Sequence, residues 1–149
     1  MRKISIFDIS DWFLSKEAMI PKKLQTLSYY FVAWEYALFD TSSIPNVVFQ
    51  AWINSPISPE LHDKYKDYGW DNIEQKQDNS SLFDSKVLEL LESVWLTYGD
   101  KSANELEALT RSEYPWKNAR KGLEEREVSD KGIEVTDMKE YYRSIYIGS

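Results

Sequence analysis

The sequence has 149 residues and contains no cysteine, one histidine and only five scattered glycines. Without cysteine there can be no disulfide, no thiolate zinc ligand and no cysteine nucleophile, which is compatible with a reducing cytosol. A lone histidine, His62, needs orienting partners before it can act in a triad or a metal cluster. The glycines form no phosphate-binding loop. We therefore expect no cofactor, no metal site and no catalytic residues.

Long apolar runs are also missing. No stretch approaches the roughly 20 residues that a membrane-spanning helix needs. The N-terminal stretch MRKISIFDISDW meets Asp8 and Asp11 too early for a signal peptide. We expect a cytoplasmic protein without a membrane partner.

Acidic residues outnumber basic ones, 25 to 18, which gives a net charge of −7. No basic block stands out, so nucleic acid is not expected as the primary ligand. An acidic surface instead favours solubility or a basic protein partner. The abundant aromatics, 6 Trp, 10 Tyr and 6 Phe, fit either a well-anchored core or an aromatic binding face.

Apolar spacing and capping residues predict a series of helices. One is expected over 8–17, with Asp8 or Ser10 as its cap, and another from Pro21 to Phe39. The second should bury a seam of residues three and four apart: Leu24, Leu27, Phe31, Trp34 and Leu38. Further helices are predicted over 59–68, before Gly69, over 84–98, and from a Ser102–Glu105 capping box onward.

The connections are less regular. Residues 47–53 fit a short strand or an apolar helix, and the polar residues 70–81 are expected to be a mobile loop. Pro115 ends one helix and begins the next, which Gly122 closes before the charged loop 123–134. Thr136 is the expected cap of a final helix over 136–147, with four residues facing inward: Met138, Tyr141, Tyr142 and Ile145.

These elements predict a mainly α protein, a compact single-domain bundle of six or seven helices over 1–149, with at most one small β element. Glutamates are plentiful on the predicted helices. Because glutamate is usually exposed, we interpret them as solvated helix faces rather than as paired catalytic groups. The residues concerned are Glu89, Glu92, Glu105, Glu107 and Glu113.

Three segments, in order, resemble the Panacea domain family, which includes SocA-like antitoxins and phage-associated proteins of the GepA type. They are LQTLSYYFVAW (24–34), QAWINSPISPELHDKY (50–65) and SANELEALTRSEYPWKNA (102–119), and the resemblance covers about residues 20–122. Two positions depart from the family pattern. Ser55 replaces a glycine, so a positive φ is not strictly needed there. Arg111 replaces a histidine, which weakly favours a scaffold role.

The resemblance implies an antitoxin that neutralises a protein toxin encoded by an adjacent gene through direct, stoichiometric binding. One alternative is a phage or prophage protein that binds a host or defence factor. A second is a hydrolase that uses Glu113, Arg111 or His62, although no acid–base pair is identifiable by spacing.

Interfaces draw most of their energy from a few aromatic or arginine anchors. Residues in the breaks between predicted helices are the best placed for this role, and we predict Trp52, Trp70, Tyr114 and Trp116 as partner-binding residues, with His62 as a further contact. For Trp52 and Trp116 the alternative of a core anchor stays open. Trp34, on the helical seam, is assigned to the core.

Overall fold

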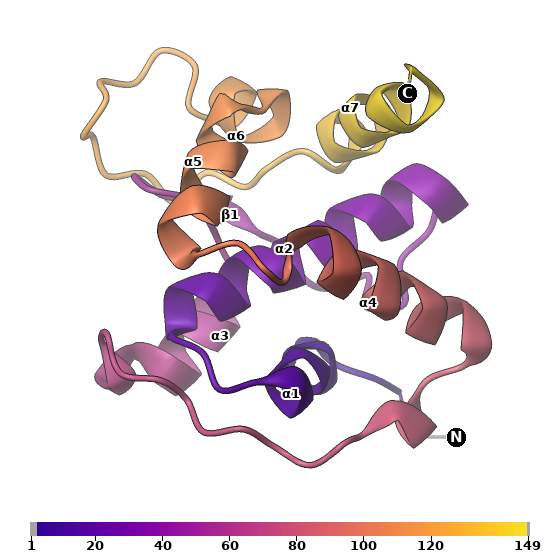
Figure 1. Ribbon diagram of the computed structural model, residues 1–149. Coiled ribbons are helices and arrows are strands. Elements are labelled where there is room, and N and C mark those ends of the chain that lie inside the picture. Colours follow the sequence, from indigo (N-terminus) through magenta and orange to yellow (C-terminus); the bar gives the residue numbers. More distant parts are fainter. Residues whose placement is uncertain (1–2, 149) are drawn as a thin grey trace.

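The computed structural model describes residues 3–148, which form seven α-helices and one two-stranded antiparallel sheet (Figure 1). This confirms the predicted mainly α architecture. Two short 3₁₀ helices, η1 and η2, complete the elements. Their bounds are α1 (Ile6–Lys16), α2 (Pro21–Phe39), β1 (Gln50–Ala51), β2 (Pro56–Ile57), α3 (Pro59–Tyr65), η1 (Lys66–Tyr68), η2 (Ser80–Leu82), α4 (Ser85–Tyr98), α5 (Ala103–Ser112), α6 (Tyr114–Ala119) and α7 (Val135–Gly148).

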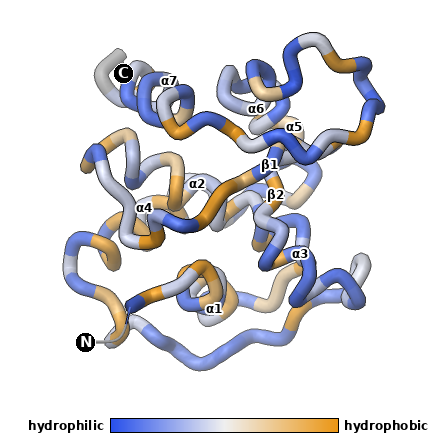
Figure 2. Tube along the Cα trace, turned by 180° about the vertical axis from the view of Figure 1, so that it is seen from behind, coloured by the Kyte–Doolittle hydropathy of each residue, from blue (hydrophilic) through white to orange (hydrophobic). Residues whose placement is uncertain are grey.

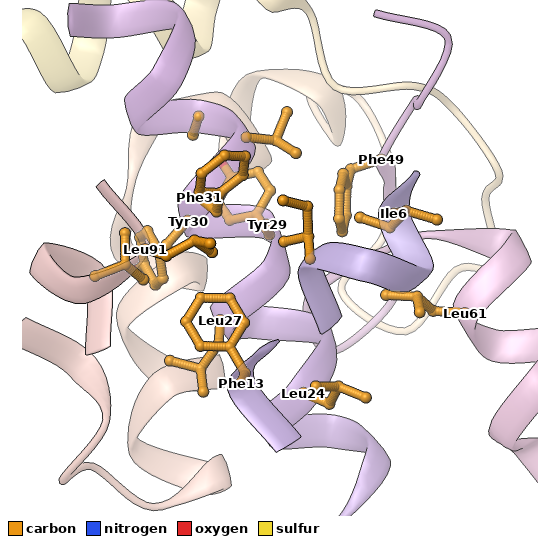
Figure 3. Packing of buried hydrophobic residues seen from close by; sticks show 14 of the residues in the cluster. Ile6, Phe13, Leu24, Leu27, Tyr29, Tyr30, Phe31, Phe49, Leu61 and Leu91 are labelled. Atoms are coloured by element: carbon orange, nitrogen blue, oxygen red, sulfur yellow. The ribbon is translucent and has the colours of Figure 1, made fainter. Parts of the chain in front are cut away.

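Helix α2 forms the centre of the molecule, with the predicted bounds. It packs against α1, α4, α5 and α7, which surround it in Figure 1. All ten residues from Leu24 to Ala33 are buried. Figure 3 shows Leu24, Leu27 and Phe31 packed with side chains of neighbouring elements. Such a helix, covered on all sides, organises the whole core.

The far end of α2 departs from the predicted seam. Leu38 is 37% exposed, and Trp34 is only partly buried, with its Nε1 donating to the Tyr98 hydroxyl at 2.9 Å. Here a groove of about 220 Å³ between α2, α4 and α7 takes the place of close packing, and both side chains line it. The seam prediction is therefore wrong for Leu38, and Trp34 lies at the edge of the core.

Local capping signals account for several helix starts. The Asp84 carboxylate accepts from the Val87 N–H at 2.9 Å, and Ser102 and Glu105 form the predicted capping box. At α1 the predicted cap is wrong. Ser5 caps that helix, with Asp8 as its reciprocal partner three residues on.

Helix α7 covers α2 on the side opposite α1 (Figure 1). It begins at Val135, so Thr136 lies inside the helix and is not its cap. Met138 and Tyr142 are buried, as predicted, and Tyr141 partly so. Ile145 is 40% exposed, because the last turns of α7 run along the edge of the core.

The segment 47–53 contains no helix, and only its residues Gln50 and Ala51 form a strand, β1. Residues Gln50 and Ala51 of β1 pair with Ile57 and Pro56 of β2. On its other side, the Ala51 N–H donates to Lys131 O at 2.9 Å. The hairpin is thereby joined to the chain just before α7.

The long connection 70–81 is hydrophilic, as Figure 2 shows, and irregular apart from η2. Its middle is nevertheless anchored. Ile73 is fully buried and exchanges two backbone hydrogen bonds with Met19, and the Lys76 N–H donates to Leu14 O at 3.1 Å. None of the helices in the described chain is long and apolar enough to cross a membrane.

Candidate partner-binding site

A pocket of about 710 Å³ opens between the first turn of α2, the β1–β2 turn, α3 and the loop before α7. Three of the predicted partner-binding residues, Trp52, His62 and Trp70, line it together. The apolar part of the wall is completed by Pro21, Ile53, Ile57, Tyr65 and Val128. Charged side chains also border it, namely Lys22, Lys66, Glu107 and Asp130.

Trp52 is held in a defined orientation on the β1–β2 turn. Its Nε1 donates to Gln50 Oε1 at 2.8 Å, and its ring makes an edge-to-face contact with the His62 ring, with centroids 4.8 Å apart. Both side chains are partly buried. His62 thus supports an aromatic wall of the pocket.

Trp70 stands at the rim, on the turn that follows η1. Gly69 turns the chain there with a φ of +56°, a left-handed conformation that glycine adopts readily. The indole is 70% exposed, and the Lys22 ammonium lies 4.2 Å from its centroid. Since such a contact stabilises by only about 0.5–1 kcal/mol at an exposed site, the ring remains available to a partner.

Trp116 does not line the pocket but lies behind its wall. Its Nε1 donates to Trp52 O at 2.9 Å, and the neighbouring Arg120 donates to Ala51 O at 2.8 Å. The Arg120 guanidinium also lies 5.4 Å from the Trp116 ring. Of the two roles left open by the sequence, this placement favours the anchor, because Trp116 and Arg120 hold the backbone at Trp52 and Ala51 in place.

Tyr114, the first residue of α6, is 51% exposed and lies outside the lining of the pocket. The structure therefore brings three of the five predicted partner-binding residues to one place and separates the other two. The following Pro115 is buried within the first turn of α6, close to the helix start predicted for it.

The two residues that differ from the family pattern, Ser55 and Arg111, each donate a hydrogen bond to another part of the chain. Ser55 is buried, its backbone is not in the left-handed region, and its hydroxyl donates to Glu107 Oε2 at 3.1 Å. The Arg111 guanidinium donates to Asn54 O at 2.8 Å. Each residue therefore ties α5 to the β1–β2 turn that forms one pocket wall.

Two of the glutamates interpreted as solvated are buried instead. Glu107 is 5% exposed, pairs with Lys22 at 3.5 Å and borders the pocket. Glu113 is 6% exposed, and one of its oxygens accepts from the hydroxyls of Tyr30 and Tyr142, each at 2.8 Å. The sequence alone could not reveal this, because the tyrosines lie 83 and 29 residues away.

Burial raises the pKa of Glu113, and the two tyrosine hydrogen bonds oppose this shift without cancelling it. The carboxyl lines neither pocket. It joins α2, the α5–α6 junction and α7 within the core. In residues 3–148 no group of three or more His, Asp or Glu side chains is placed to hold a metal ion.

Fold and pocket together define a small mainly α domain with an aromatic recess on one face. The family model described as antitoxin SocA-like, Panacea domain, matches residues 24–117, more than half of the chain. The protein therefore belongs to the SocA-like antitoxin family of Panacea domains. The match includes Trp52, His62 and Trp70, whereas the loop at Val128 and helix α7 lie beyond it. Comparison with curated proteins gave no match, and neither did comparison with solved structures.

Proposed function

We propose that this protein is the antitoxin of a toxin–antitoxin pair and neutralises a protein toxin in the cytoplasm by direct, stoichiometric binding, without catalysing a reaction. Membership of the SocA-like family carries this proposal. The toxin is the product of an adjacent gene.

The pocket face is the proposed contact region. Tryptophan anchors in concave, largely apolar sites dominate the energy of many interfaces. Trp52 and Trp70 offer two such rings in one recess, and Trp70 is exposed enough to gain contacts on binding. A toxin molecule bound to this face would be inhibited, and each antitoxin molecule would inhibit one toxin molecule.

Co-expression with the neighbouring gene product tests the function. Growth arrest caused by that product should be relieved by this chain, and purified toxin should be inhibited in a linear titration with a sharp end point. Persistent arrest despite comparable expression of both proteins would argue against the antitoxin role.

A pair of substitutions tests the site. Trp70→Ala should weaken toxin binding by about tenfold or more, as loss of an aromatic anchor does. Tyr146→Ala is the matched control, since Tyr146 is 62% exposed but lies on α7 and does not line this pocket. Equal affinities for the two variants would place the toxin on another surface.

A further inference from the structure

We infer that the pocket receives a basic amphipathic segment of the partner, which inserts two or three large apolar side chains into the recess and directs lysine or arginine side chains at the acidic stretches beside it. This deepens the proposed function and rests on it, because the partner is taken to be the protein toxin. Three observations carry the inference: the size of the pocket, the charge of the stretches beside it, and the exposed Trp70 ring with its contact to Lys22.

Size indicates more than one inserted side chain. An engineered apolar cavity of about 150 Å³ accommodates one benzene ring. The pocket has about 710 Å³ and is open to solvent. Its apolar walls come from four separate parts of the chain, at Pro21, at Trp52 to Ile57, at Tyr65 to Trp70 and at Val128. A short segment with several apolar side chains fits such a recess better than a single anchor.

The rim is acidic. Two exposed stretches that border the pocket, 60–71 and 124–130, carry eight exposed carboxylates against three exposed basic side chains. The acids are Glu60, Asp63, Asp67, Asp71, Glu124, Glu125, Glu127 and Asp130, and the bases are Lys64, Lys66 and Arg126. Complementary charge speeds association and selects the partner. The charge of these flanking stretches therefore favours a basic segment and disfavours nucleic acid.

The exposed indole of Trp70 supplies a second reason for a cationic partner. Within the chain, Lys22 already lies over this ring at 4.2 Å. Lysine or arginine over tryptophan is the most favourable pairing of its kind. The ion pair of Lys22 with Glu107 is long, at 3.5 Å. Lys22 can therefore move aside, and a cation of the partner can take its place over the Trp70 ring.

Synthetic peptides of about 15 residues, long enough to form a helix on binding, test the chemistry on the full-length chain. The first has leucine at helical spacing i, i+3, i+4 and i+7 and lysine on its other face. The second replaces every lysine with glutamate, and the third has the composition of the first in scrambled order. Isothermal titration should show binding of the first, with the other two weaker by about tenfold or more. Equal binding of the acidic or the scrambled peptide would overturn the inference.

A matched pair of substitutions locates the peptide. Val128→Lys removes an aliphatic side chain from the pocket and adds a positive charge, and Leu96→Lys makes the same chemical change on α4, outside it. The two side chains are 84% and 82% exposed, so neither change should disturb folding. Val128→Lys should weaken both the basic peptide and the toxin by about tenfold relative to Leu96→Lys.

The two proposals fail in different ways. If the chain neutralises the toxin but the basic peptide does not displace it, and both lysine variants bind the toxin equally, the inference is wrong and the antitoxin function stands. If the chain never neutralises the neighbouring gene product, the proposed function is wrong. Selective binding of the basic peptide, lost in Val128→Lys, would then still support the inferred chemistry of the pocket.

Discussion

Trp116→Phe is the substitution that best separates support of the pocket wall from direct contact with a partner. Phenylalanine keeps an aromatic ring but cannot donate to Trp52 O, which in the wild type accepts from Trp116 Nε1 at 2.9 Å. A hydrogen bond contributes a net of about 1 kcal/mol, and a buried acceptor left unpaired costs about 1–3 kcal/mol. The smaller ring also weakens the contact with Arg120. We expect the free energy of unfolding to fall by about 1–3 kcal/mol.

Urea unfolding monitored by circular dichroism measures this change, and the melting temperature should drop by about 2–4 °C for each kcal/mol in a chain of this length. Trp70→Phe is the control, because Trp70 is 70% exposed, and its stability should stay within about 0.5 kcal/mol of the wild type. Affinity for the toxin is measured on the same proteins under conditions where each is folded. If Trp116→Phe leaves stability unchanged but weakens binding about tenfold, Trp116 is itself an interface anchor and the positioning role is refuted.

Three further predictions concern the core. Leu27→Ala should lower the free energy of unfolding by about 2–5 kcal/mol, because Leu27 is fully buried, whereas Leu38→Ala, at a 37% exposed position, should cost less than half as much in the same urea titration. Burial raises the pKa of Tyr98 to about 12, so its contribution to stability is present below its ordinary pKa of about 10 and is lost as the pH rises toward the folded value. Urea midpoints should therefore fall between about pH 10 and 12, and less steeply in Tyr98→Phe. Burial raises the pKa of Glu113, so its contribution is present below its ordinary pKa of about 4.3 and lost as the pH rises through the folded value. Glu113→Gln cannot ionise, and its stability relative to the wild type should therefore improve as the pH rises above about 4.3; a difference independent of pH would contradict the assignment.

Sequence patterns predicted those features of the fold that neighbouring residues determine. The bounds of α2 follow from Pro21 and the apolar run behind it, and Asp84 and Ser102 mark helix starts through their own hydrogen bonds. The α1 cap was misplaced because Ser5 and Asp8 can each cap a helix, and only the folded backbone selects Ser5. The exposure of Leu38 depends on how α4 and α7 meet α2, which the period of one helix does not specify.

The site was predictable only in part, for the same reason. Aromatics in the breaks between helices pointed to Trp52 and Trp70, but nothing local joins Trp52 to Trp116, 64 residues away. Their common place in one wall is a property of the tertiary structure. Glu113 likewise looked like an ordinary exposed glutamate until two distant tyrosines surrounded it.

The position of α7 over α2 also bears on how the chain is synthesised. The aromatic face of α2 leaves the ribosome about 100 residues before the helix that covers it, an interval of roughly 5–20 s at 5–20 residues per second. Until α7 docks, Glu113 lacks the Tyr142 hydroxyl and Tyr29 lacks its ring contact with Tyr142. The family match ends at residue 117, yet a shortened chain without 135–148 would expose this face and tend to aggregate. A nascent chain of this fold is therefore incomplete as a folding unit until α7 has been made.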